Sequence, residues 1–409
     1  MIAQALSRAE NLGRMAWTNE EAAMEIRNRI RRAHSFATDA REAAREFYAA
    51  VEQADMALVV FFCSSEYDLE TLAEELTRLF AGVQVVGCTT AGEIGPGGCR
   101  EHSLTGASFP AGSFDVVSGR IGHLHQFEIG AGQTFTETLL EKLESRAPQA
   151  GADNSFALLL IDGLSMREEP VTRALQNTLD RLPLVGGSAG DGLRFVSTNV
   201  YFEGHFYADS AVLILVTTQL PFKLFKTQHF VATDERLVVT EADPALRIVR
   251  EINGLPAAQE YARVTGVDAN DLDPMRFAAC PVVVMIDGTS YVRSIQKANP
   301  DGSLTFFCAI DTGLVFRIGK GVDLLENLEQ TFAKIREEIG PPQLVLGCDC
   351  ILRKLEESRS PLKERVAEAF VQNNTVGFYT YGEQFQGIHV NQTLVGVAIG
   401  VDPTERDNG

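Results

Sequence analysis

One pattern occurs three times along this chain and constrains its fold more than any single motif. Each copy has a hydrophobic run, a helix-like stretch, a second hydrophobic run and a glycine turn that ends in an acid. The copies cover residues 56–93, 157–191 and 344–383. Their equivalent glycines, Gly87, Gly186 and Gly377, lie about 100 and about 190 residues apart, so each copy is far longer than the unit of a short solenoid repeat. The repeats are therefore expected to be whole sub-domains.

The alternation of strand-like and helix-like stretches predicts an α/β protein with mixed sheets. We expect a layered sandwich built from repeated strand-helix-strand units, with a sheet shared by two of them. Two domains are predicted, over residues 54–250 and 251–402. Residues 1–53 carry no proline, and no glycine after Gly13, so they are predicted to be helical throughout. This segment is interpreted as an arm that packs on the main body; a dimerisation helix, which would make the protein a homodimer, is the alternative.

Charge and composition exclude several classes of protein. A formal net charge of −19 argues against nucleic-acid binding, because an acidic surface repels phosphate backbones. No stretch approaches the roughly 20 uninterrupted apolar residues that a membrane helix needs, and the polar start lacks the apolar core of a signal peptide. The seven cysteines are an odd number and lie mostly inside hydrophobic runs, which is typical of reduced, buried thiols. The sequence predicts a cytoplasmic protein that binds neither nucleic acid nor membrane.

The short motifs do not predict an enzyme. The glycine turns lack both the Gly-x-Gly-x-x-Gly spacing before a helix and the Lys-Ser/Thr ending of a phosphate loop. No Gly-x-Ser-x-Gly elbow precedes a helix. The pair Cys348 and Cys350 lacks the second cysteine pair or the histidines of a structural zinc site, so both are interpreted as strand-end cysteines. Since no nucleophile can be matched with a base, no catalytic residue is predicted.

The acids that end the three turns allow two interpretations. Glu93, Asp191 and Glu383 either cap nearby backbone amides, which is the commoner role of an acid after glycine, or point into a shared cleft. If the repeats face one another, the turns converge at one end of the sheets, where open α/β sheets bind ligands. The polar side chains that would converge there with the acids are Thr89, Thr90, Tyr379 and Tyr381.

Two histidines lie in strand-like surroundings. His229 is flanked by aromatic residues that include Phe225 and Phe230. A neutral imidazole in such a strand suits a proximal haem ligand, and it equally suits a core histidine with satisfied hydrogen bonds. His389 is the second candidate for an iron ligand, although its polar neighbours favour a hydrogen bond to Asn391.

These motifs together resemble the FIST N and FIST C sensory domains, in the right order over roughly residues 54–400. The segments that carry the resemblance are residues 85–94, 162–165, 184–191, 376–383 and 391–393. Gly377–Glu383 is the most specific of them. The resemblance implies a bacterial or archaeal signal-transduction input module that binds a small ligand and regulates a partner, either a sensor histidine kinase or a cyclic-di-GMP enzyme. The chain shows no kinase, cyclase or receiver segment, so it resembles the stand-alone members.

A softer resemblance connects the chain with the NosP subgroup, whose members bind haem, sense nitric oxide and control a histidine kinase. It is carried by residues 228–230 and 348–353. It implies a haem iron held by His229, with Phe225 and Phe230 beside it, that takes nitric oxide at its open face.

A sensor for an amino-acid-type ligand without haem is the alternative. It would hold ammonium and carboxylate groups at the converging turns. The residues expected there are Thr89, Thr90, Glu93, Arg293, Arg353, Tyr381 and Glu383.

Overall fold

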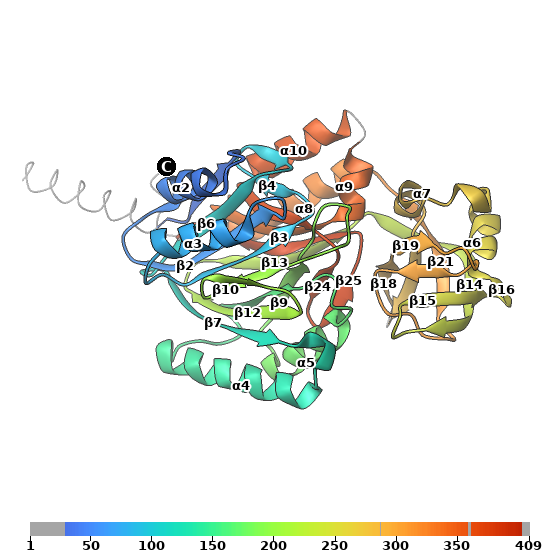
Figure 1. The fold of residues 1–409 in the computed structure, drawn as a ribbon, viewed down its shortest axis with the longest axis horizontal. Helices are drawn as coiled ribbons and strands as arrows, with labels where there is room; N and C mark the ends of the chain where they lie inside the picture. Colours follow the sequence, from blue (N-terminus) through green and yellow to red (C-terminus); the bar gives the residue numbers. More distant parts are fainter. Residues whose placement is uncertain (1–28, 287, 359–360, 403–409) are drawn as a thin grey trace, which may run out of the picture.

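The computed structural model describes residues 29–286, 288–358 and 361–402. It is a mixed α/β protein, as the repeats predicted, with four sheets. A larger body holds three of these sheets, and a smaller lobe, yellow and orange in Figure 1, holds the fourth. Among the described residues, no helix is both long and apolar enough to cross a membrane.

Three units of the body follow one plan. Each begins with an outer strand and a helix, which are followed by two parallel strands with helical structure between them. A hairpin and a returning strand complete the unit. Unit 1 contains β1 (Arg31–Ser35), α2 (Ala40–Val51), β2 (Met56–Ser64), α3 (Leu69–Leu79), β3 (Val85–Thr90), β4 (Glu93–Gly95), β5 (Gly98–Arg100) and β6 (Leu104–Pro110). Unit 2 contains β7 (Phe114–Gly122), α4 (Ile129–Arg146), β8 (Ser155–Ile161), α5 (Glu168–Leu179), β9 (Leu184–Ser188), β10 (Val200–Phe202), β11 (His205–Tyr207) and β12 (Ser210–Thr218). Unit 3 contains β13 (Phe222–Gln228), α8 (Leu324–Ile339), β22 (Leu344–Cys350), α9 (Ile351–Glu357), α10 (Leu362–Gln372), β23 (Thr375–Thr380), β24 (Glu383–Phe385), β25 (Ile388–Val390) and β26 (Thr393–Ile399).

The lobe is inserted into unit 3, between β13 and α8. Its strands are β14 (Phe230–Asp243), β15 (Ile248–Ile252), β16 (Leu255–Pro256), β17 (Val282–Ile286), β18 (Thr289–Arg293), β19 (Ile295–Ala298), β20 (Leu304–Phe306) and β21 (Val315–Gly321). Its helices α6 (Ala257–Thr265) and α7 (Pro274–Ala279) pack beside this sheet. The lobe has a hydrophobic core of its own.

The three units exchange their hairpins in a closed cycle. The hairpin β10–β11 of unit 2 pairs with β3 of unit 1, and the hairpin β24–β25 of unit 3 pairs with β9 of unit 2. The hairpin β4–β5 of unit 1 completes the cycle by pairing with β23 of unit 3. Each of the three sheets of the body is therefore shared by two units, as expected. The turns between second strand and hairpin are brought together at the carboxyl ends of the parallel strands, where main-chain bonds tie them: Ala91 N to Tyr379 O at 2.9 Å and Gly190 N to Thr89 O at 3.0 Å.

The sheets face one another around a common core, and the helices cover their outer sides. Strand residues from all three units form the central cluster, in which the rings of Phe62 and Phe378 stack with centroids 4.5 Å apart. Separate outer clusters join α2 and α3, α4 and α5, and α8–α10 to their sheets. Because both faces of the parallel strands are covered, runs such as Leu58–Cys63 are apolar at every position rather than at alternate ones.

The prediction that residues 1–53 form a helix throughout is wrong for part of the described chain. Arg31–Ser35 is a strand that pairs antiparallel with β6, and only Ala40–Val51 is helical. Asp39 starts that helix by accepting a hydrogen bond from the backbone amide of Glu42. The absence of glycine and proline favours a helix locally, but the free edge of β6 selects a strand. Residues 1–28 of the predicted helical segment lie outside the described residues.

Candidate functional site

Two of the three acids that end the glycine turns are buried within the turns themselves. Glu93 accepts hydrogen bonds from the Thr90 hydroxyl and, at 2.7 Å, from the Ser103 hydroxyl. In unit 3, Glu383 accepts hydrogen bonds from the hydroxyls of Thr380 at 2.5 Å and Thr393 at 2.7 Å. Burial raises the pKa of Glu93 to about 7 and that of Glu383 to about 8. Each acid also accepts a hydrogen bond from a backbone amide at 3.2 Å, which corresponds to the capping interpretation, although Glu93 also borders a cavity.

The third acid anchors a loop and a tyrosine. Asp191 accepts hydrogen bonds from the backbone amides of residues 195–197 at 2.8 to 2.9 Å and another from the Tyr381 hydroxyl. The ring of Tyr381 stacks on Phe195, with centroids 4.6 Å apart. Tyr381 therefore ties unit 3 to unit 2. The hydroxyl of Thr89 also has a partner in the protein. It accepts a hydrogen bond at 3.0 Å from the backbone amide of Asn199, which precedes the unit 2 hairpin.

Two adjoining cavities open where the turn of unit 1 meets α9 of unit 3. The first, which we call the turn cavity, has a volume of about 330 Å³ and lies between the end of β2, the turn at 90–93, the loop at 191–194 and α9. The second, the tyrosine cavity, has a volume of about 240 Å³. Its lining includes Cys99, Arg100, Lys354, Glu357, Lys363 and Tyr379. Glu101, Lys354 and Ser358 line both cavities, which we together call the junction cleft. The cleft lies at the carboxyl ends of parallel strands, the usual place of ligands in open α/β sheets.

Lys354 stands on the boundary between the two cavities. Its Nζ donates hydrogen bonds to the backbone oxygen of Ala91 at 2.7 Å and to the Glu101 carboxylate at 2.6 Å. A Cβ added to Gly92, which has a φ of +132°, would lie 2.8 Å from this Nζ. The backbone conformation favours glycine at this position of the unit 1 turn, because other residues rarely adopt that φ. A side chain here would also displace the flexible end of Lys354.

A buried network of ionisable groups lies beneath the tyrosine cavity. The wholly buried Arg353 donates to Asp349 Oδ1 at 2.6 Å, and its NH2 lies 3.9 Å from Glu357 Oε1. The hydroxyl of Tyr379 donates to Glu357 Oε2 at 2.8 Å. Burial, reinforced by the charge of Asp349, raises the pKa of Glu357 to about 8. Burial alone would lower the pKa of Arg353, but the charges of Asp349 and Glu357 raise it, so the guanidinium stays charged. Burial also raises the pKa of Asp349, whose carboxyl group interacts with that of Glu357.

The same network reaches His229, the predicted haem ligand. Arg353 NH1 lies 3.0 Å from His229 Nδ1, and His229 Nε2 lies 2.9 Å from a carboxylate oxygen of Glu356. A guanidinium can only donate, so Nδ1 accepts and Nε2 carries the ring proton that is donated to Glu356. Burial lowers the pKa of this histidine, which is consistent with a neutral ring.

The residues around His229 do not fit a haem in this arrangement. A proximal ligand presents a free ring nitrogen to iron, whereas both nitrogens of His229 are engaged and its side chain has no exposed surface. Phe230 packs against the imidazole, with ring centroids 4.2 Å apart. Phe225 is buried against Gly396 of the neighbouring strand β26. Protein atoms fill the positions next to the ring that a porphyrin would need.

His389 and Arg293 lie together at the contact between body and lobe. His389 is 2% exposed; its Nδ1 lies 3.3 Å from the amide nitrogen of Gln384, and its Nε2 has no partner among the described residues. Arg293 donates to the backbone oxygen of His389 at 3.1 Å. Neither residue lines the junction cleft.

Of the residues predicted to bind an amino-acid-type ligand, Thr90 and Glu93 line the cleft, and Arg353 lies beneath it through its contact with Glu357.

Several residues of the cleft were missed in the sequence, among them Lys354, Glu357 and Cys99. One signal could have revealed part of the site. Asp349, Arg353 and Glu357 follow one another at four-residue intervals just after a hydrophobic run, which places the two later residues on one side of a helix. The basic residues Arg100 and Lys363 come from distant segments, and no local pattern connects them.

Cys348 and Cys350 lie on β22 as buried, free thiols whose pKa values burial raises. In the described part of the chain, no group of three or more histidine, cysteine, aspartate or glutamate side chains is placed to hold a metal ion.

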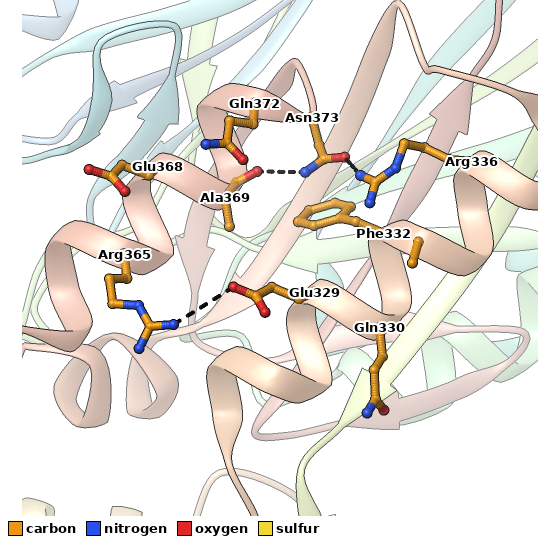
Figure 2. A pocket seen from close by; sticks show the side chains of 10 residues that line it. Glu329, Gln330, Phe332, Arg336, Arg365, Glu368, Ala369, Gln372 and Asn373 are labelled. Atoms are coloured by element: carbon orange, nitrogen blue, oxygen red, sulfur yellow. Dashed lines mark hydrogen bonds and ion pairs between the residues drawn. The ribbon is translucent and has the colours of Figure 1, made fainter.

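A larger groove of about 510 Å³ lies between α8 and α10, where two pairs of polar side chains interact with each other (Figure 2). Glu329 on α8 faces Arg365 on α10 at 4.0 Å, and Arg336 bonds to Asn373. Asn373 in turn donates to the backbone oxygen of Ala369 at 2.8 Å. These pairs hold the two helices together, so the junction cleft is the stronger candidate for a ligand site.

Comparisons with known proteins agree with the resemblance seen in the sequence. The FIST N domain matches residues 57–255, and the FIST C domain matches residues 257–386. No curated protein matches the sequence significantly. Among solved structures, one of cyanuric acid hydrolase, described as an evolutionary innovation by structural concatenation, is 11% identical. The alignment covers 91% of this chain and 99% of that one, with a TM-score of 0.35, a similarity too low to support any argument.

Proposed function

This chain belongs to the FIST family of signal-transduction sensors, and on that premise we propose that it senses a small molecule bound in the junction cleft. The observation that carries the proposal is the position of the cleft, where segments of all three units meet at the carboxyl ends of parallel strands. A ligand held there contacts the unit 1 turn and α9 of unit 3 at once. Binding can therefore change how these units are held together.

The buried network offers a route from the cleft to the lobe. Glu357 lines the tyrosine cavity and faces Arg353, which bonds to His229. His229 lies between β13 and the first strand of the lobe, and its backbone oxygen accepts the amide of Val322, where the chain returns from the lobe. Helix α7 of the lobe packs on α9. A ligand that moves α9 would thus alter both connections to the lobe, in proportion to its preference for one arrangement over the other.

The signalling partner that we propose is a sensor histidine kinase or a cyclic-di-GMP enzyme, as the family resemblance implies. A net charge of −19 favours a partner that presents a basic surface, because complementary charge accelerates association. Nitric oxide sensing through a haem at His229 stays a prediction from the resemblance. It requires that His229 first give up its bonds to Arg353 and Glu356, and the spectroscopic test is described in the Discussion.

The sensor function is tested by thermal unfolding in the presence of a set of amino acids, organic acids, amines and nucleosides. A compound that binds only the folded state raises the Tm. We expect at least one compound to raise the Tm of the wild type and of Lys223→Ala, a control whose lysine pairs with Glu338, but not that of Lys354→Ala. The proposal is overturned if no compound acts, or if Lys354→Ala responds as the wild type does.

A further inference from the structure

The chain enters and leaves the lobe at one place. His229 precedes the first strand of the lobe, Val322 follows its last, and the amide of Val322 donates to the backbone oxygen of His229 at 2.8 Å. The next residues on each side, Phe230 and Gly321, are partners in the pairing of β14 with β21. Two crossings that lie side by side can act as a single hinge. The lobe can turn about it as a unit, because it has a hydrophobic core of its own.

Away from this hinge, a buried cluster of charged groups joins the lobe to the body. Arg247 of the lobe lies between Glu168 and Glu169 at the start of α5, with its NH2 2.6 Å from a carboxylate oxygen of each. The other oxygen of Glu169 accepts the backbone amide of Ala309, also in the lobe, at 2.8 Å. These bonds close the lobe onto α5, and they break if the lobe turns away.

The closed contact contains two donors that lack an acceptor. The Gln384 amide nitrogen lies 3.3 Å from His389 Nδ1 and can only donate, so Nε2 of the ring carries the proton. This Nε2 and the amide nitrogen of Asn391 are both buried and have no hydrogen bond among the described residues. They lie 2.7 and 3.1 Å from the position of a Cβ on Gly382, while the Asn391 oxygen accepts the amide of Ser294 in the lobe at 3.5 Å. Buried donors without acceptors cost free energy, and that cost disappears when water reaches them.

We infer that the lobe is a hinged lid on the body and that protonation of His389 opens it. Opening requires no ligand in the junction cleft, so the lid is a property beyond the proposed sensor function. In the closed state His389 is 2% exposed, and a charge on its ring is buried. In the open state water solvates the charged ring. Protonation therefore favours the open state.

The charged groups around His389 come from both sides of the contact. Burial has the largest influence and lowers the pKa of His389 below its ordinary value of 6.5. Glu168 and Glu169 on α5 raise this pKa in part, whereas Arg247 and Arg293 of the lobe lower it further. The closed state consequently binds fewer protons than the open state, so closure is strongest above about pH 6.5 and weakens as the pH falls below it.

The neighbouring groups with shifted pKa values keep their charge between pH 5.5 and 7.5. Burial alone would raise the pKa of Glu169, but nearby positive charges lower it below its ordinary value of 4.5, so this acid stays ionised. Burial raises the pKa of Cys308, which lies near the same charged groups, to about 11, so it stays a thiol. Both arginines remain charged throughout.

Lid opening is measured by hydrogen exchange of two backbone amides, each expressed as a protection factor to remove the pH dependence of intrinsic exchange. Ala309 donates across the contact between body and lobe, whereas Gly319 donates to Pro281 inside the lobe at 2.7 Å. Opening exposes the first amide and leaves the second protected. We expect the protection factor of Ala309 to fall by up to about tenfold from pH 7.5 to 5.5, because the exposed ring of His389 titrates at about 6.5.

Two variants with matched controls connect this opening to the residues named. His389→Gln removes the titrating ring, so the protection factor of Ala309 should no longer depend on pH, whereas the exposed His205→Gln should behave as the wild type. Arg247→Leu leaves two buried acids without their counter-charge and should lower the protection factor of Ala309 by at least about tenfold at pH 7.5. The exposed Arg250→Leu in the same lobe should leave it unchanged.

Equal protection factors for Ala309 and Gly319 in the wild type would overturn the lid, because the contact would then open only when the lobe itself unfolds. An Arg247→Leu variant in which both amides lose protection equally would do the same. The role of His389 is refuted if the protection factor of Ala309 does not fall with pH, or if His389→Gln keeps the pH dependence of the wild type.

Discussion

Arg353 NH1 donates a hydrogen bond to Nδ1 of His229 across 3.0 Å, and this bond fixes the tautomer of the imidazole. Because the guanidinium has no acceptor, the ring proton must reside on Nε2, where it meets the Glu356 carboxylate at 2.9 Å. The histidine thus connects α9, which lines the junction cleft, to the point where the chain enters the lobe. Its neighbours explain why a residue that resembles an iron ligand in the sequence has a hydrogen-bonding role in the structure.

Haem binding is tested at this histidine. The geometry predicts that protein expressed with a haem precursor shows no stoichiometric Soret band, because Arg353 and Glu356 occupy both ring nitrogens of His229. The measurement is the ferrous absorption spectrum with and without nitric oxide, compared with His229→Ala and His389→Ala. A stoichiometric band that nitric oxide shifts and His229→Ala abolishes would instead support the NosP resemblance.

Removal of the buried guanidinium should strongly destabilise the protein. Arg353→Leu leaves Asp349 without its buried counter-charge and Nδ1 of His229 without its donor, so we expect the free energy of unfolding to fall by about 3–5 kcal/mol in urea titrations at pH 7. The exposed Arg365 on α10, which faces Glu329 at 4.0 Å, provides the control. Arg365→Leu should change stability by less than about 1 kcal/mol. Equal losses in the two variants would show that the buried network contributes no more than a surface pair.

Two glycines on paired strands should differ in their tolerance of alanine. A Cβ on Gly377 would lie 1.9 Å from the backbone oxygen of Gly347, whereas a Cβ on Gly347 meets only side-chain atoms at 3.4 Å or more. Gly377→Ala must push β23 away from β22, so we expect a loss of at least about 1–3 kcal/mol, measured by urea unfolding. Gly347→Ala should be close to neutral. If both variants unfold at the urea concentration of the wild type, the strands approach less closely than described.

The buried turn acid Glu383 predicts a stability that falls with rising pH. Burial raises its folded-state pKa to about 8, above the ordinary value of 4.5. Between these values the folded state binds more protons than the unfolded state, so stability is full below about pH 4.5 and decreases up to about pH 8. The decrease is at most about 1.4 kcal/mol per pH unit for this group. Urea midpoints of the wild type and Glu383→Gln from pH 5 to 8 measure it; the variant should have the shallower slope, and parallel curves would contradict the assignment.

The repeats in the sequence predicted the α/β class and the sharing of sheets between units, but not the lobe that is inserted between β13 and α8. Buried parallel strands need long apolar runs such as Leu58–Cys63, and three such runs before glycine turns predict mixed α/β units with shared sheets. The FIST resemblance depended on the same turns, and the domain matches confirm it. The strand at Arg31–Ser35 was missed because its conformation depends on β6, about 70 residues further along the chain.

The sequence alone determined the repeated units, their hydrophobic strands and the turns that mark the family, because these features follow from local periodicity and from the need to bury apolar side chains. Only the tertiary structure decided which polar residues meet. The exchange of hairpins brings Arg100 and Tyr379 to one cavity, and the packing of α9 places Glu357 beneath it. Hydrogen-bond partners and burial depend on such contacts between distant segments. These contacts place His229 in the buried network and make the junction cleft the candidate ligand site.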